Sequence, residues 1–288
     1  MPWLGYILGS AATLSLYDLC KKHSAEGNRT FSVLLMTTAT GFAAVATTLA
    51  IRGRLDAAIA LPPIHMLLLA IKSVIVATSW ALAYWALKTL PLTIMAPIRA
   101  TGPIWTTLAA LFIFAEIPTA IQAVGFLLAF GGSYAFSLAT RREGFTMHTP
   151  SIMLAIGATL FGTASALYDK HLLHSIQIPP EVVLLWFMGG MTLIYFIAFF
   201  LSKRFDHTPF KWRWSIPAVG LLLALSDFLY FNAISSPDAR ISILSTIRRS
   251  STILTFLIGG AVFRETNLLR KGLALAAILI GVCLLCIS

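Results

Sequence analysis

The sequence is dominated by ten apolar segments of about 20 residues, separated by short connections that carry charges, glycines and prolines. About 20 apolar residues in an α-helix are enough to cross the hydrocarbon core of a bilayer. Inside a membrane only helices and closed barrels satisfy the backbone, and these segments lack the alternation of barrel strands. The sequence therefore predicts an all-α integral membrane protein with ten transmembrane helices. They cover residues 2–20, 31–51, 65–87, 92–114, 118–139, 151–172, 182–201, 216–234, 241–263 and 268–287.

The composition excludes a soluble enzyme. Of the 288 residues 58% are apolar and 11% are charged, whereas soluble domains contain about 25% charged residues. The net charge of +10 does not indicate nucleic-acid binding, because most basic residues flank apolar segments, where anionic lipid headgroups stabilise them. The expected partners are the lipid bilayer and a small-molecule substrate, and no nucleic acid. Scattered cysteines and histidines, and the lack of a phosphate-binding loop, predict no enzyme, no metal and no cofactor.

Three landmarks occur twice in the same order, 149 to 151 residues apart. They are Leu16-Tyr17-Asp18 with Leu167-Tyr168-Asp169, Ile98-Arg99 with Ile247-Arg248, and Phe114-x-Glu116 with Phe263-x-Glu265. Such spacing indicates a tandem duplication of a five-helix unit, with repeats at residues 1–144 and 145–288. Because five is odd, the second unit enters the membrane from the opposite side. Inverted repeats of this kind are typical of secondary transporters, whose site lies near the midplane between the repeats.

Charged residues inside the apolar segments mark the expected polar interior. Each costs about 2.5–3.5 kcal/mol in a membrane, so such residues usually face the inside of the bundle. Apart from Arg270 and Lys271 at the start of the tenth segment, they fall on the first, third and fourth segments of each repeat, which leaves the fifth and tenth segments as exterior helices. These exterior helices would face lipid or a second copy, so we expect a monomer or a homodimer formed through them.

Cations and aromatic residues of these segments are the candidate substrate-binding residues: Arg99, Arg248, Arg249, Lys72, Trp80, Tyr84 and Tyr230. The acidic residues Asp227, Asp18 and Asp169 are candidates for coupling or ion pairing. Structural pairing is the alternative for each acid. Asp18 would then pair with Lys21 or Lys22, Asp169 with Lys170, and Asp227 with Lys72.

The runs Ala96-Pro-Ile-Arg-Ala-Thr-Gly-Pro-Ile-Trp105 and Ile247-Arg-Arg-Ser-Ser-Thr-Ile-Leu254 each lead to a Glu and downstream glycines. In this respect the chain resembles the EamA-type repeats of the drug/metabolite transporter superfamily. The resemblance implies ten helices and a central cavity lined by helices 1–4 and 6–9, with helices 5 and 10 at the periphery. It does not specify a substrate. The Arg248-Arg249 pair also resembles the Lys-Arg pair of the sugar-phosphate antiporter branch.

The membrane orientation is left open by two conflicting indications. The resemblance implies that both termini are cytoplasmic, whereas Lys and Arg gather in connections on the other side, 13 against 4. The positive-inside rule then favours termini outside.

The predicted function is secondary transport of a small polar metabolite, anionic or zwitterionic, with proton or exchange coupling, in a bacterial inner membrane. The alternatives are export of cationic or amphipathic drugs through the Asp residues, a passive channel, and a membrane scaffold.

Overall fold

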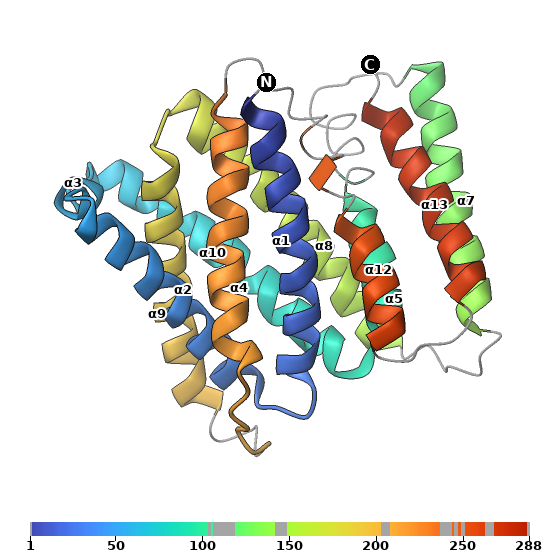
Figure 1. Cartoon of the computed structure of the whole chain (residues 1–288), viewed down its shortest axis with the longest axis horizontal. Coiled ribbons are helices and arrows are strands. Elements are labelled where there is room, and N and C mark those ends of the chain that lie inside the picture. Colours follow the sequence, from blue (N-terminus) through green and yellow to red (C-terminus); the bar gives the residue numbers. More distant parts are fainter. Residues whose placement is uncertain are drawn as a thin grey trace.

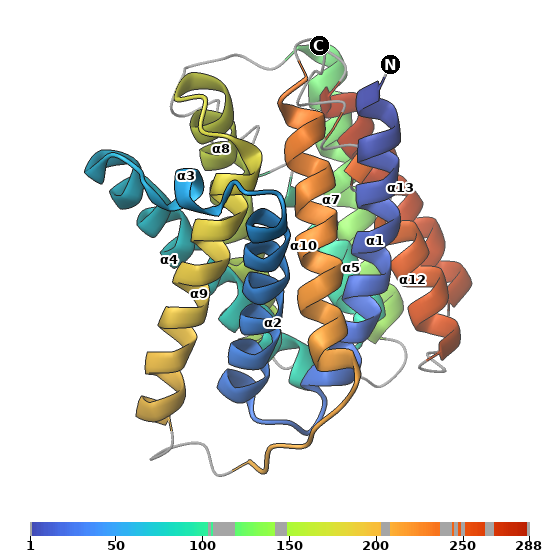
Figure 2. The same cartoon turned by 60° about the vertical axis from the view of Figure 1, so that its left-hand side comes forward.

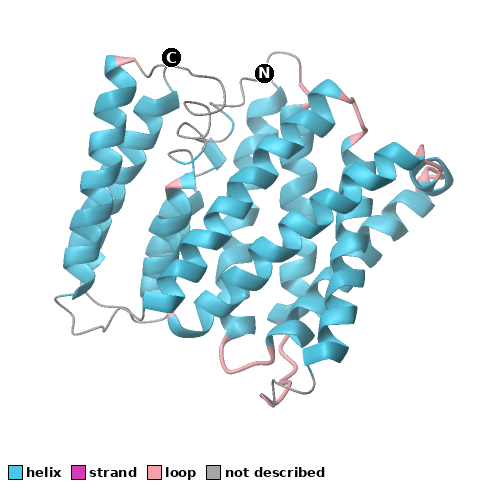
Figure 3. Cartoon of the chain, turned by 180° about the vertical axis from the view of Figure 1, so that it is seen from behind, coloured by secondary structure: helices cyan, strands magenta, loops and turns pink. Residues whose placement is uncertain are grey.

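The computed structural model describes residues 2–102, 105, 119–141, 149–202, 208–236, 244, 247–248, 251–262 and 268–286. All regular elements in these residues are helices, as Figure 3 shows from behind, so the all-α prediction is confirmed for this part of the chain. The helices of the first half are α1 (Pro2–Ala25), α2 (Thr30–Ile51), α3 (Leu55–Ile59), α4 (Pro63–Thr89), α5 (Leu92–Ala100) and α7 (Ala120–Arg141). The second half contains α8 (Thr149–Lys170), the π-helical turn η1 (His171–Ser175), α9 (Pro180–Ser202), α10 (Ser215–Ile234), α12 (Ser251–Val262) and α13 (Leu268–Cys286).

Within the described residues, five helical stretches are long and apolar enough to cross a membrane by length and composition. They are Thr30–Ile51, Pro63–Thr89, Thr149–Leu173, Pro180–Ser202 and Ser215–Ile234. Each lies within two residues of a predicted helix at both ends. The predicted helices at 92–114 and 241–263 fall partly outside the described residues, which show α5 and α12 there.

The first helix is longer than predicted. It continues through Lys21 and Lys22 to Ala25 instead of ending at residue 20. Both lysines are buried, at 3% and 9% exposure. The Lys22 ammonium donates hydrogen bonds to the carbonyls of Leu87 (2.8 Å) and Leu90 (2.9 Å) at the end of α4. The two charges were wrongly assigned to a membrane-flanking connection, because interhelical partners let them continue the helix inside the bundle.

The helices form a bundle in which elements distant in sequence lie side by side. In Figures 1 and 2, α1 runs beside α10, and α2 lies between α9 and α10. Behind them α4 packs on α8 and α9, and α5 packs on α12 and α8. Both marked chain ends lie at the same end of the bundle (Figure 1).

The helices α7 and α13 form a closely packed pair at one edge of the bundle (Figure 1). A Cβ atom added at Gly132 would come within 2.9 Å of the Ala274 carbonyl oxygen, and one at Gly281 within 2.6 Å of the Gly125 carbonyl oxygen. Only glycine permits this approach, so Gly132 and Gly281 serve helix packing, whereas nothing lies within 4 Å of a Cβ atom added at Gly131. The outward side chains of the pair include Leu127 and Leu273. Its use in a homodimer stays a prediction.

Candidate functional site

A cavity of about 180 Å³ lies among six helices drawn from both halves of the chain. Its walls come from α1, α4, α5, α8, α9 and α10, together with Arg248. Most of the candidate residues of the sequence meet there. The polar and aromatic lining is formed by Tyr17, Lys21, Lys72, Ser79, Trp80, Arg99, Thr159, Ser165, Asp169, Phe187, Asp227, Tyr230, Phe231 and Arg248.

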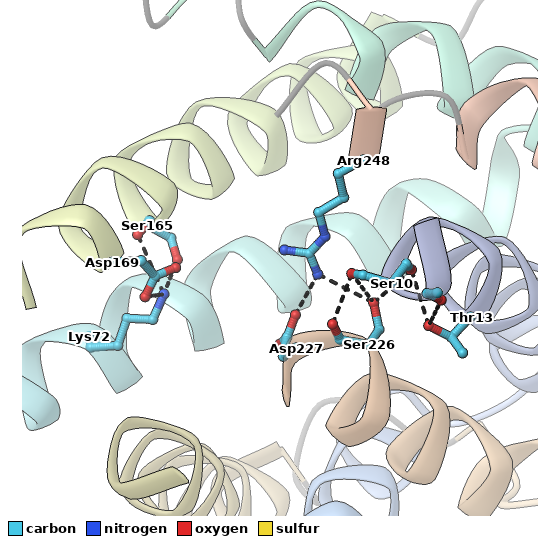
Figure 4. A network of polar contacts seen from close by, with 9 residues as sticks. Ser10, Thr13, Lys72, Ser165, Asp169, Ser226, Asp227 and Arg248 are labelled. Atoms are coloured by element: carbon cyan, nitrogen blue, oxygen red, sulfur yellow. Dashed lines mark hydrogen bonds and ion pairs between the residues drawn. The ribbon is translucent and has the colours of Figure 1, made fainter. Parts of the chain in front are cut away.

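The first buried ion pair joins α4 to α8 and is shown at the left of Figure 4. The Lys72 ammonium lies 2.6 Å from a carboxylate oxygen of Asp169 and donates to the Ser165 hydroxyl at 2.5 Å. The two charged side chains are only 3% and 7% exposed. The ammonium also lies 5.6 Å from the centre of the Phe187 ring. These contacts compensate both charges away from bulk water.

The second ion pair belongs to a network that joins α1, α10 and Arg248 (Figure 4). A guanidinium nitrogen of Arg248 lies 2.5 Å from an Asp227 carboxylate oxygen and 3.4 Å from the Ser226 hydroxyl. The guanidinium stacks on the Tyr230 ring at 3.9 Å. Ser10 donates from its hydroxyl to the Ser226 carbonyl (2.8 Å), and Ser226 returns a bond to the Ser10 carbonyl (3.1 Å). Arg248 is therefore held by a charge, a hydroxyl and an aromatic face.

The third ion pair joins Arg99 on α5 to Asp18 on α1. The arginines of the two Ile-Arg motifs therefore pair differently, since Arg99 contacts an acid on α1 and Arg248 contacts an acid on α10. Asp169, which follows the second Leu-Tyr motif as Asp18 follows the first, pairs with Lys72.

The three local or structural pairings proposed for the acids are wrong. Asp18 forms an ion pair with Arg99 and not with its sequence neighbours. Asp169 forms an ion pair with Lys72, and Lys170 is exposed. Asp227 forms an ion pair with Arg248. In each case the acid meets a cation that lies far away in the sequence. Sequence spacing could not show this, because interhelical neighbours depend on how the helices pack.

The structure also brings Lys21 into the cavity, a residue absent from the candidates. Its ammonium donates to the Tyr17 hydroxyl at 3.1 Å and lies 5.3, 5.0 and 5.0 Å from the ring centres of Tyr17, Trp80 and Tyr84. We call these three rings the aromatic cage. The i,i+4 spacings of Tyr17 with Lys21 and of Trp80 with Tyr84 were signals in the sequence that could have found it.

The remaining candidates divide into two groups. Trp80 and Tyr230 line the cavity, whereas Tyr84 is fully buried beside Trp80, at 6.4 Å between ring centres. Arg249 lies outside the described residues. Within the described part of the chain, no three His, Cys, Asp or Glu side chains gather as a metal site would need.

Comparisons with known proteins concern the family and the fold. The family model of the EamA-like transporter family matches residues 1–138. A crystal structure of a protein with 16% sequence identity superposes with a TM-score of 0.69, covering 96% of this chain and 94% of that chain. No curated protein matches the sequence. The structural likeness extends over both halves and concerns the fold alone.

Proposed function

We propose that this chain, whose residues 1–138 match the EamA-like transporter family, is a multi-pass membrane transporter of the drug/metabolite transporter type. It carries a small polar metabolite, anionic or zwitterionic, by alternating access. The observation that carries this proposal is the cavity. A polar, charge-lined space inside a chain of 58% apolar residues is costly in a membrane, and such intramembrane charges mark substrate or ion pathways.

The proposed architecture is ten helices in two inverted repeats, residues 1–144 and 145–288. Packing within the described helices supports it. If the repeats are equivalent, α1 corresponds to α8 and α4 corresponds to α10. The contact of α1 with α10 then corresponds to the contact of α8 with α4, and both contacts are present. Since α2 likewise corresponds to α9, the contact of α2 with α10 corresponds to that of α9 with α4. The pairs α2–α9, α5–α12 and α7–α13 map onto themselves, as elements on a two-fold axis do.

The ion pairs are proposed as the elements that change partners during the cycle. Asp18, Asp169 and Asp227 each hold a cation across helices, so opening of the cavity toward one side of the membrane separates some pairs and re-forms them on closing. Arg99, Arg248 and the adjacent Arg249 are the proposed substrate contacts, and Asp227 is the proposed coupling acid. Export of cationic drugs is the weaker candidate, because all three acids are engaged by protein cations.

The first test is a thermal-shift screen of purified protein against amino acids, sugar phosphates, carboxylates, nucleosides and cationic drugs, because a ligand of the folded state raises the melting temperature. The compound class that stabilises the protein is then loaded into proteoliposomes for counterflow. We expect an anion or zwitterion to be exchanged, and Arg248→Ala to abolish the exchange while inserted protein persists. Stabilisation by cationic drugs alone would overturn the choice of substrate class.

Coupling is tested in the same liposomes. Asp227→Asn is expected to remove the dependence of uptake on a pH gradient and to retain exchange at equal pH. Uptake by Asp227→Asn that still follows the gradient would exclude Asp227 as the coupling acid. A bacterial inner membrane is the proposed location, with orientation to be read from protease protection of a tag at either terminus.

A further inference from the structure

The four cations that line the cavity differ in whether a carboxylate neutralises them. Lys72, Arg99 and Arg248 each contact a carboxylate, and each of these three pairs is neutral. No described carboxylate lies within ion-pairing distance of Lys21, although the side chain is 3% exposed. Among the described cavity residues and their pair partners, a protonated Lys21 therefore leaves one positive charge in excess.

The aromatic cage stabilises this charge without cancelling it. The faces of Tyr17, Trp80 and Tyr84 attract the ammonium through cation–π contacts, because each ring centre lies within about 6 Å of it. An ammonium has three hydrogen-bond donors, and the Tyr17 hydroxyl accepts from one of them. The arrangement holds a cation at the cavity wall with donor capacity for a ligand.

We propose that Lys21 in the aromatic cage is the docking site for the carboxylate of a monoanionic organic acid that carries an apolar or aromatic group. The inference rests on the proposed function and names its substrate class. One carboxylate balances one excess charge, whereas a phosphate group of charge about −1.5 to −2 leaves part of its charge uncompensated. A zwitterion would bring an ammonium to acids that Lys72, Arg99 and Arg248 already occupy.

The rest of the cavity wall fits the apolar part of such an acid. Trp80, Phe187, Tyr230 and Phe231 contribute aromatic surface to the lining. The volume of about 180 Å³ lies below the roughly 300–1,000 Å³ of pockets for drug-sized ligands. A metabolite with one ring or a short apolar chain matches this space.

The experiment uses four probes that share one phenyl group: phenylacetate, phenylacetamide, phenylalanine and phenyl phosphate. Each is titrated into the purified full-length protein by calorimetry, with the melting temperature as a second readout. We expect phenylacetate to bind at least tenfold more tightly than each of the other three. The assignment would be overturned if phenylacetamide bound as tightly as phenylacetate, or if phenylalanine or phenyl phosphate bound more tightly than phenylacetate. It would also be overturned if none of the four probes bound.

Lys21→Met then tests the residue. It keeps the length of the side chain and removes its charge, so phenylacetate affinity should fall at least tenfold, with Lys21→Arg falling less. The melting temperature of Lys21→Met without ligand should be unchanged or higher, because no carboxylate loses its partner. Retained phenylacetate affinity, or loss of folded protein in both Lys21→Met and Lys21→Gln, would overturn the proposal.

Lys22→Met is the matched control, because it removes the adjacent buried lysine, whose ammonium bonds the Leu87 and Leu90 carbonyls. It should lower the melting temperature and leave phenylacetate affinity within threefold. If Lys22→Met lost as much phenylacetate affinity as Lys21→Met, the loss would reflect overall charge or folding and not a contact with Lys21. That result would overturn the site. Phenylacetate binding without counterflow in proteoliposomes would leave the site intact and overturn transport, whereas counterflow independent of Lys21 would overturn the site alone.

Discussion

The two buried lysines at the cavity, Lys21 on α1 and Lys72 on α4, have their charges stabilised in different ways. Lys72 is neutralised by Asp169 and bonded to Ser165. Lys21 is surrounded by aromatic faces and one tyrosine hydroxyl. An ion pair fixes both side chains and neutralises their charges. A cation–π contact lowers the free-energy cost of burying the cation but leaves its positive charge uncompensated. The difference separates a lysine that holds two helices together from a lysine that can hold a ligand.

The largest effect is expected from Lys72→Met. It leaves the buried Asp169 without its cation, so the free energy of unfolding should fall by about 3–5 kcal/mol. Unfolding by SDS in mixed micelles measures the change. Adding Asp169→Leu to Lys72→Met should recover most of the loss, because the uncompensated charge is then gone. If Lys72→Met lowered the free energy of unfolding no more than Lys21→Met, the two lysines would not differ in their contribution to stability.

The next effect is expected from Arg248→Met, which removes the Asp227 ion pair and the stacking on Tyr230. Both charged side chains are partly exposed, at 18% and 15%, so solvent screens the pair, and the loss should be about 2–3 kcal/mol, below that of a fully buried pair. The same SDS titration measures it. A double-mutant cycle with Asp227→Asn that gives no coupling energy would show that this ion pair does not stabilise the fold.

A smaller effect is expected from Ser226→Ala. The Ser226 hydroxyl reaches the Ser10 carbonyl and lies near Arg248, and interhelical hydrogen bonds in membranes contribute about 0.6 kcal/mol on average and at most about 1.7. A loss near 1 kcal/mol is therefore predicted. Ser10→Ala serves as its partner variant, and additive losses in the double variant would show that the two hydroxyls act independently.

The smallest effect is expected from Tyr17→Phe, which keeps the ring of the aromatic cage and deletes the hydroxyl that accepts from Lys21. The free energy of unfolding should change by less than about 1 kcal/mol. Tyr17→Leu, which also removes the ring, should cost more and thereby isolate the contribution of the aromatic face. Equal losses in the two variants would assign the stabilisation of Lys21 to the hydroxyl alone.

The sequence predicted most described helices because hydropathy and length determine whether a segment can be buried in a membrane. It also identified the cavity charges Lys72, Arg99, Asp169, Asp227 and Arg248, since charges in apolar segments rarely face lipid. The partners of these charges were missed, because pairing across helices follows from packing. Lys21 was missed for a related reason: charges were used to end the first segment, although a helix continues wherever buried partners receive its charges.

The two hydrogen bonds from Lys22 to carbonyls at the end of α4 have a consequence for the aromatic cage. Leu87 and Leu90 lie just before Pro91, where α4 gives way to α5. These bonds tie the last turn of α1 to the C-terminal end of α4. Tyr17 and Lys21 lie on α1, whereas Trp80 and Tyr84 lie on α4. Lys22 therefore joins the two helices that together form the aromatic cage.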